Sequence, residues 1–396
     1  MPRPIPRLLR RAALPAAAAL ASVALLAGCA APSAATGGAA SGSSGEAGQA
    51  CRGTEIPFAE VAFATDAREL EGPSTACLAD AGLPMIESDE EPAVPLTVTD
   101  ADGEEVTVSD ASRILALDIS GTLAATVFGL GLGDRVVGRD GSTGFAEASD
   151  LPVVTQDGHS LSAESILALD PTVVLTDTTL GPRDVLEQLR DAGIPVVITT
   201  SERRVDNVEQ VVAEVADALG VPGRGKLLSD AIQGDLDDIA ATIAAGIPAE
   251  AADRPRTIFL YVRGSANVYY LFGEESGADS LIDAVGGYDV AGEIGWQGMR
   301  PVTAEAIAAA QPELVLLMTG GLESVGGVDG LLEKVPALAT TPAGEHRRFV
   351  DMADTEILGF GPRTPAVVEA LARAIWAPAS SGHLGSDATP QAGSDD

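Results

Sequence analysis

The chain contains one short sequence unit twice. Residues 162–175 read SAESILALDPTVVL, and residues 303–316 read TAEAIAAAQPELVL. In each copy a Ser or Thr can cap a helix that carries a Glu in its first turn. A proline then ends the helix, and an apolar strand follows. Two such units half a chain apart predict two similar α/β lobes, with a ligand cleft at the carboxyl ends of their strands.

Short apolar strands alternate with helices around both copies, which is typical of parallel sheets covered on both faces. We expect further strands at 113–118, 135–138, 194–199, 257–262 and 347–351, and further helices at 121–130, 184–192, 206–219, 280–285, 331–335 and 365–376. Alternation around Asp102-Gly103 predicts a β-hairpin over 96–108. The predicted fold class is α/β: two Rossmann-like lobes with parallel sheets, one long linker helix and a cleft between the lobes.

The linker helix is expected at 224–245, a stretch without proline that would span about 33 Å and reach from one lobe to the next. The predicted organisation is a lipoprotein signal peptide (1–28), a lipid anchor and flexible linker (29–50), a small extension (51–95), an N-terminal lobe (96–222), the linker helix (223–250), a C-terminal lobe (251–378) and a disordered tail (379–396).

The N-terminus predicts export. Four arginines precede an apolar stretch over 12–26, and Leu26-Ala27-Gly28-Cys29 closes it. That order is typical of a signal peptide. The Leu-Ala-Gly-Cys sequence resembles the lipobox of bacterial lipoproteins, which implies cleavage before Cys29 and a lipid on its sulfur. The alternative, an uncleaved membrane anchor, is disfavoured because the apolar run is shorter than the ~20 residues that a spanning helix needs.

The remaining cysteines, Cys51 and Cys77, most often form a disulfide in a protein outside the cytoplasm. Metal binding is the weaker interpretation, because no histidine lies near the pair in sequence. The formal net charge of −34 argues against nucleic acid and anionic lipid surfaces as partners.

Three histidines occur in the chain, and His159 is the candidate ligand among them. It lies in QDGHSLSAE, a turn that leads directly into the first repeated helix, with Gly158 beside it. His346 sits in a charged turn and His383 in the tail, where solvent-exposed roles are expected. A loop histidine is more often a surface residue than a ligand, so the sequence alone leaves both interpretations of His159 open.

A second candidate pair ends an expected strand, in Tyr261-Val262-Arg263-Gly264. Strand alternation places Tyr261 and Arg263 on the same side of the sheet. A nearby guanidinium stabilises a phenolate and lowers the phenol pKa from its usual value of about 10. Tyrosinate is a known axial ligand of ferric haem. The alternative is that Tyr261 packs on the sheet and Arg263 is a surface cation.

Two more residues are candidates for the same cleft. Arg300 lies 141 residues after His159, the same offset that separates Glu164 from Glu305, so it is expected to face His159. A histidine opposed by an arginine suits haem, which offers an iron and two propionates. Met318 ends the second repeated strand in LLMTGGLES, and either core packing or ligand contact fits it. No set of nucleophile and base, phosphate-binding loop or zinc spacing is visible, so an enzyme is not expected.

Several motifs together resemble a known family, the HmuT-like haem-binding lipoproteins of the siderophore/cobalamin (class III) substrate-binding proteins of ABC transporters. The resemblance spans about residues 96–378. It rests on VTDADGEEVTV, QDGHSL, Tyr261-Val262-Arg263-Gly264, LMTGGLES and Gly359-Phe360-Gly361-Pro362-Arg363-Thr364-Pro365.

The resemblance implies that His159 and Tyr261 are axial ligands of the haem iron, that Arg263 hydrogen-bonds Tyr261 and that Met318 lies close to the haem. It also implies that Glu164 and Glu305 dock onto arginines of the permease. The expected protein is a monomer, lipid-anchored on the extracytoplasmic face of the cell membrane. Its transported ligand would be haem b, and its partners an ABC permease and ATPase.

Three other functions fit the sequence less well. The same fold could bind a ferric siderophore or cobalamin, but the iron would then already be chelated and His159 and Tyr261 would have no role. An exported redox or hydrolytic enzyme lacks a visible catalytic set. A manganese or zinc binder would need several histidine and acidic ligands, and only His159 is available.

Overall fold

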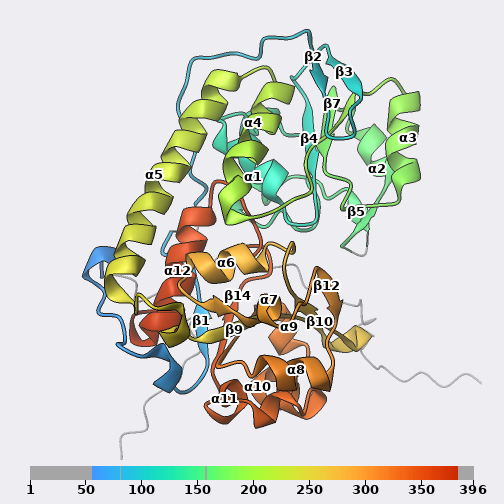
Figure 1. The fold of residues 1–396 in the computed structure, drawn as a ribbon. Helices are drawn as coiled ribbons and strands as arrows, with labels where there is room; N and C mark the ends of the chain where they lie inside the picture. Colours follow the sequence, from blue (N-terminus) through green and yellow to red (C-terminus); the bar gives the residue numbers. More distant parts are fainter. Residues whose placement is uncertain (1–55, 81, 157, 382–396) are drawn as a thin grey trace, which may run out of the picture. The chain divides into compact units, whose positions relative to one another are not determined.

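The computed structural model describes residues 56–80, 82–156 and 158–381, and two α/β lobes make up this part of the chain (Figure 1). The predicted signal peptide, Cys29, the predicted flexible linker (29–50), Cys51 and most of the predicted tail lie outside these residues. The repeated unit folds as predicted. Ser162 caps α2 (Ala163–Ala168) by accepting a hydrogen bond from the Ser165 N–H, and Thr303 caps α8 (Ala304–Ala310) through the Ala306 N–H. In each lobe a buried strand follows.

The first lobe contains a parallel three-stranded sheet in the order β4–β7–β8. Its strands are β4 (Ile114–Leu117), β7 (Val173–Thr176) and β8 (Val196–Ile198), and every residue in them is buried. Alternate side chains belong to different apolar clusters: one face packs with α2 and α3 (Arg183–Asp191), and the other with α1 (Thr122–Gly129) and α4 (Val208–Ala218). The prediction of a parallel sheet covered on both faces is therefore confirmed.

The second lobe is built on a sheet in the order β1–β14–β13–β9–β10–β12, with β11 paired to β9. Strands β1, β14, β13 and β9 are parallel, and β10 and β12 add an antiparallel edge. The bounds are β1 (Ser74–Ala76), β9 (Arg256–Arg263), β10 (Val268–Phe272), β11 (Tyr288–Asp289), β12 (Met299–Pro301), β13 (Leu314–Met318) and β14 (Phe349–Met352).

Helices cover both faces of this second sheet. One face packs with α6 (Ala278–Ala284) and α12 (Thr364–Trp376). The other packs with α7 (Val290–Glu293), α8, α9 (Thr319–Glu323) and α10 (Gly327–Lys334), and α11 (Pro342–Glu345) lies beside β13. Alternate residues of β9 divide between these faces, so that Phe259 belongs to the first and Leu260 to the second.

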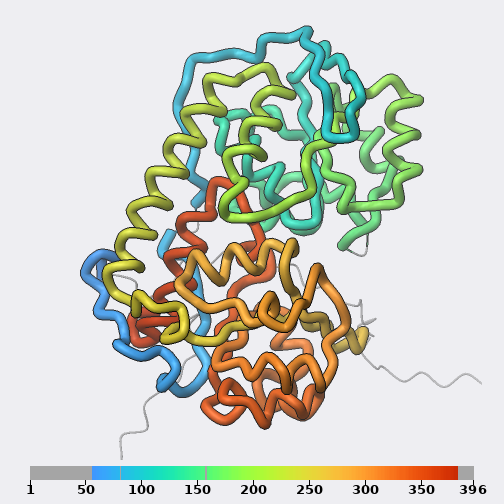
Figure 2. The backbone as a smooth tube through the Cα atoms, in the orientation of Figure 1, coloured from blue at the N-terminus to red at the C-terminus, as the bar shows by residue number. Residues whose placement is uncertain are grey.

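The predicted linker is α5 (Pro222–Gly246), which packs against α4 in the first lobe and against α12 (Figure 2). The predicted hairpin is confirmed as β2 (Leu96–Thr99) and β3 (Glu105–Val108), with Leu96 opposite Val108. Among the described residues, no helix is both long enough and apolar enough to cross a membrane.

The predicted strand at 135–138 is wrong. Residues 133–135 form a 3-10 turn, and Val136 makes a single bridge to Ile114. The next backbone N–H groups explain why the pairing stops: that of Val137 still donates to Ile114, but that of Arg139 donates to Pro152 instead. The chain therefore leaves the edge of the sheet after one residue, although its sequence is apolar enough for a strand.

The extension before the first lobe folds against the second lobe as β1, which pairs in parallel with β14. Cys77 follows this strand and is disulfide-bonded. Because Cys51 lies outside the described residues, its pairing with Cys77 stays a prediction.

Candidate functional site

Four aromatic side chains form a stacked row on one face of the second sheet. Tyr261 lies opposite Tyr270 and Phe259 opposite Phe272 in the β9–β10 pairing, so all four point to the same side. The Tyr261 ring centroid lies 6.4 Å from that of Tyr270 and 6.1 Å from that of Phe272. Phe259 is fully buried, whereas Tyr261 and Tyr270 are half-buried near the carboxyl end of β9. The exposed end of this row offers a flat apolar surface to a ligand.

His159 lies in the first lobe, in the turn between β5 (Thr155–Gln156) and β6 (Ser160–Leu161). The backbone of Gly158 adopts φ +82°, a conformation that glycine accommodates without strain. The turn brings the imidazole Nε2 to 3.4 Å from Nη1 of Arg263 in the second lobe. The other ring nitrogen, Nδ1, is buried and has no hydrogen-bond partner within the described residues. The structure thus brings together His159 and the Tyr261–Arg263 strand end.

The charges around this site act on both candidate ligands. Burial lowers the pKa of His159, and the nearby Arg263 lowers it further, so the imidazole is favoured in its neutral, lone-pair-bearing form. Burial raises the pKa of Tyr261 above its usual value, and Arg263 opposes that rise. The predicted lowering by Arg263 is therefore present, but in the ligand-free protein desolvation outweighs it and the phenol stays protonated.

Asp354 adds a negative charge that the sequence did not reveal. Its carboxylate accepts a hydrogen bond from the Gly320 N–H at 2.8 Å, just after the end of β13. Although the residue is exposed overall, the protein around its carboxylate raises its pKa, while Arg263 lowers it. The Asp354 charge in turn raises the pKa of Tyr261. The positive charge of Arg263 therefore acts on His159, Tyr261 and Asp354.

The other predicted pocket residues lie at different distances from this centre. Met318 is half-buried at the end of β13 and packs on the same apolar cluster as Tyr261. Arg300 lies opposite Leu271 in the β10–β12 pairing, which places it on the far face of the sheet, and its guanidinium stacks 4.5 Å from the Trp296 ring. Among the described residues, His159 contacts Arg263 and Arg300 stacks on Trp296, and no hydrogen bond joins Arg300 to His159.

Met299 lies on the same face of the sheet as the candidate site, although its sequence context did not single it out. It lies opposite Phe272 and so shares the face of Tyr261, and it is 52% exposed. A methionine before Arg300 carried no signal in the sequence, because only the pairing of β12 with β10 decides which of the two neighbours faces the aromatic row.

The two repeated glutamates occupy equivalent positions. Glu164 lies in the first turn of α2 and Glu305 in the first turn of α8, and both are exposed. Carboxylates at helix N-termini are favoured by the helix dipole whether or not they contact a partner.

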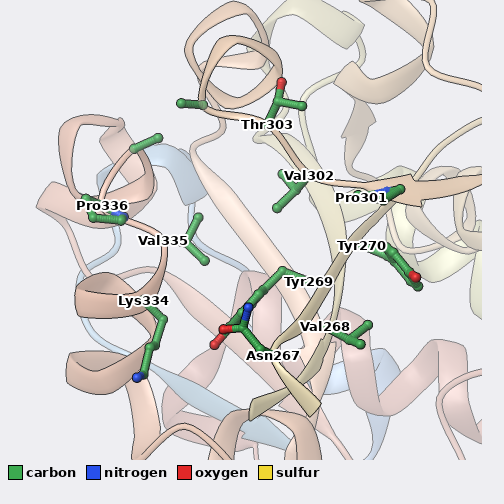
Figure 3. Close-up of a pocket in the computed structure, with 12 residues that line it drawn as sticks. Asn267, Val268, Tyr269, Tyr270, Pro301, Val302, Thr303, Lys334, Val335 and Pro336 are labelled. Carbon is green, nitrogen blue, oxygen red and sulfur yellow. The ribbon is translucent and has the colours of Figure 1, made fainter. Parts of the chain in front are cut away.

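A cavity of about 450 Å³ lies on the opposite face of the second sheet from Tyr261 (Figure 3). Tyr269 points into it, while the next residue on β10, Tyr270, points away. Its walls are mostly apolar and include Val302 and Val335, with Lys334 at one side. Tyr270 of the aromatic row is nevertheless among the residues that line the cavity, so the cavity and the row adjoin at β10.

This fold and this site define a two-lobed ligand-binding protein. A family model described as "Periplasmic binding protein" matches residues 119–355. A crystal structure of the heme binding protein HmuT is similar to this chain at 36% identity and a TM-score of 0.74, over 79% of this chain and 100% of that one. Further HmuT structures have an arginine, a tyrosine or a histidine replaced by alanine.

Two proteins of known sequence are also similar to this chain. An uncharacterized ABC transporter substrate-binding lipoprotein, YvrC of Bacillus subtilis, is 26% identical over 71% of this chain and 86% of its own length. A cobalamin-binding protein of Halobacterium salinarum is 28% identical over 56% of this chain and 58% of its own length.

The chain belongs to the periplasmic binding protein family. It is a class III substrate-binding protein of an ABC transporter, and its role is transport rather than catalysis. The α/β fold expected from the sequence is confirmed.

Proposed function

We propose that this protein binds haem b between its lobes and delivers it to an ABC permease and its ATPase for iron acquisition. The observation that carries the proposal is the approach of His159 from the first lobe to the Tyr261–Arg263 strand end of the second. Imidazole and phenolate are both established axial ligands of haem iron. The flat aromatic row beside Tyr261 suits a planar macrocycle.

Arg263 would change partners when haem binds. In the ligand-free protein its guanidinium lies at His159 Nε2, where it can donate a hydrogen bond only while that nitrogen carries no proton. Iron would take the lone pair of Nε2, so Arg263 would be free to donate to the Tyr261 oxygen. The positive charge of the iron and that of Arg263 would together lower the phenol pKa enough to form the phenolate.

The remaining predicted residues differ in how near they lie to this core. Met318 would contact the haem at the end of β13, and Arg300, on the outer face of the edge strand, would meet a propionate only by swinging around that edge. Glu164 and Glu305 would each contact one arginine of the permease. Cys29 would carry the lipid that holds the protein on the extracytoplasmic face of the cell membrane, in keeping with the name of the Bacillus relative.

The test is a titration of the purified mature protein with ferric haem, followed by absorption spectroscopy. A one-to-one endpoint with a six-coordinate His/Tyr spectrum supports the proposal. A Soret region that matches free haem at every ratio would refute it.

Cobalamin is the second candidate ligand, because a relative of 28% identity is a cobalamin-binding protein. A ferric siderophore would suit the same fold. Calorimetry with cyanocobalamin and with a ferric siderophore separates these ligands from haem. In both of them the metal is already fully coordinated, so no coordination position is open to Tyr261. Tight binding of either one that survives Tyr261→Phe would favour the alternative.

A further inference from the structure

The cavity in the second lobe lies directly beside the repeated glutamate of that lobe. Thr303 and Ala304 line the cavity, and Glu305 follows them in the first turn of α8. Consecutive Cα atoms are about 3.8 Å apart, so the backbone of Glu305 is next to the cavity wall. The Glu305 side chain is exposed. A partner that reaches this carboxylate therefore reaches the cavity as well.

The walls of the cavity are mostly apolar. Figure 3 shows Val302, Val335 and the partly exposed ring of Tyr269 on different sides of it. Its volume of about 450 Å³ falls within the range of about 300–1,000 Å³ that is typical of ligand pockets. All of its lining residues lie between positions 267 and 337, in the second lobe. The cavity is thus large enough to accept a large apolar side chain without any contribution from the first lobe.

Glu305 by itself offers little affinity to a permease. Exposed ion pairs are screened by salt and restrict two flexible side chains, so they contribute more to orientation than to affinity. At protein interfaces most of the affinity comes from a few large side chains that enter pockets, with polar contacts around them. The cavity beside Glu305 has the shape and the apolar walls that such a side chain needs.

An apolar side chain also accompanies the glutamate of the first lobe. Leu167 follows Glu164 by three residues on α2, so the two lie on the same face of the helix, and Leu167 is 42% exposed. The equivalent residue of α8 is the smaller Ala308. Both repeated glutamates therefore have an apolar feature beside them: an exposed leucine in the first lobe and a cavity in the second.

The composition of the chain argues against two other occupants of the cavity. Residues 29–55 contain no Val, Leu, Ile, Met or aromatic residue, and residues 382–396 contain one leucine together with three aspartates. These segments offer little that could fill an apolar cavity next to a glutamate. A second copy of the chain would carry the same net charge of −34, which opposes association. A permease segment that contains an arginine has the charge that Glu305 attracts.

We propose that the cavity receives a large apolar side chain of the permease, from the same segment whose arginine pairs with Glu305. The apolar side chain would supply affinity, and the ion pair would fix the orientation in which transport takes place. This proposal rests on the proposed docking of Glu305 onto the permease. It does not depend on which ligand the cleft between the lobes holds.

The experiment fills the cavity and measures docking directly. Ala304→Trp places an indole at the cavity wall and leaves Glu305 and the capping Thr303 in place, and Ala304 is exposed in the free protein. The matched control is Ala241→Trp, at an exposed position of α5. The dissociation constant between each purified mature variant and the permease–ATPase complex in lipid nanodiscs is measured at about 0.1 M and about 0.5 M salt. Thermal unfolding verifies that each variant is folded.

Pro336→Trp covers the case in which Ala304→Trp does not fold. Pro336 is exposed and lies on another side of the cavity, two residues after the end of α10 (Figure 3). An indole at this position fills the same space from a different segment, so the same result is expected of it.

Ala304→Trp should weaken docking by about ten- to a hundredfold, the factor for leaving one large apolar side chain unburied. The factor should be the same at both salt concentrations. Glu305→Ala should weaken docking by less than about tenfold at the lower salt concentration and by still less at the higher one, because an exposed ion pair is screened. Ala241→Trp should leave docking unchanged.

Docking of the folded cavity variants at the wild-type strength would overturn the proposal. A loss that disappears at high salt would also overturn it, because the substitution would then act through the charge of Glu305. Wild-type dimers that Ala304→Trp dissociates would identify a second copy as the occupant instead. If Glu305→Ala docks like the wild type at both salt concentrations, the proposed docking of the glutamate fails. If Glu305→Ala weakens docking and the cavity variants do not, only the role of the cavity fails.

Discussion

Nη1 of Arg263 lies 3.4 Å from Nε2 of His159, although 104 residues separate the two in sequence. This contact joins a loop of the first lobe to a strand end of the second. Because Arg263 also acts electrostatically on Tyr261, one guanidinium influences both proposed iron ligands.

Tyr261→Phe should weaken ferric haem binding more than His159→Ala, because an anionic ligand stabilises Fe(III) more than a neutral one does. The phenolate-to-iron charge-transfer band should disappear. The matched control is Tyr270→Phe, which removes a phenol from the stacked neighbour on β10. If Tyr270→Phe removes the band and Tyr261→Phe does not, the ligand has been assigned to the wrong tyrosine.

Arg263→Ala should keep haem bound but raise the pH at which the tyrosinate band appears. Arg263 lowers the pKa of Tyr261, so the phenol pKa must rise when this charge is removed. Arg263 also lowers the pKa of His159, so the His159 pKa of the ligand-free variant should rise, which NMR titration of the imidazole can follow. Unchanged midpoints in both titrations would contradict the shared role of Arg263.

Glu164→Ala combined with Glu305→Ala should leave haem affinity intact and abolish haem transport into vesicles that contain the permease. Each single change should cost less than the double change. The matched control replaces Glu187 and Glu333, exposed helix residues of the first and second lobes. Added salt should weaken docking of the wild type more than that of the double variant, since exposed ion pairs are screened within about 10 Å at 0.1 M salt. If the double variant transports haem at the wild-type rate, the two glutamates do not dock onto the permease and only stabilise the N-termini of their helices.

Asp140 should make the protein less stable as pH rises from about 4 to about 7. Burial, and then the Asp118 charge, raise the pKa of Asp140 to about 7. The folded state therefore holds a proton that the unfolded chain releases near pH 4, so stability falls between about pH 4 and pH 7 and stays lower above that range. The expected loss is roughly a few kcal/mol, measured by urea unfolding at pH 5 and pH 8. Asp140→Asn should flatten this dependence; a wild-type profile that rises with pH would contradict the assignment.

Glu90→Ala should lower the stability of the protein by about 1–2 kcal/mol, because two N–H groups at the start of α5 lose their acceptor. The neighbouring Glu91 provides the control, since its ion pair with Arg135 involves a largely exposed carboxylate and such pairs contribute about 0–1 kcal/mol. Thermal unfolding of both variants compares them directly. Equal losses would mean that Glu90 does not cap the helix.

Features that rest on local periodicity and capping were predictable from the amino-acid sequence. The two Ser/Thr-capped helices, their following strands, the hairpin at 96–108 and the helix that became α5 all follow from residues close together in the chain. The position of Tyr261 and Arg263 on the same side of β9 was equally predictable, because side chains alternate along a strand with a period of two.

Features that depend on which distant segments become neighbours could not be predicted from the sequence. The strand expected at 135–138 failed because Arg139 bonds Pro152 rather than the sheet. The pairing of β12 with β10 turned Met299 toward the aromatic row and Arg300 away from it, a choice that one residue of register reverses. The pairing of β1 with β14 and the contact of Glu90 with the start of α5 were not predicted from the sequence. Hydrogen bonds between segments far apart in the chain leave no periodic pattern in either segment.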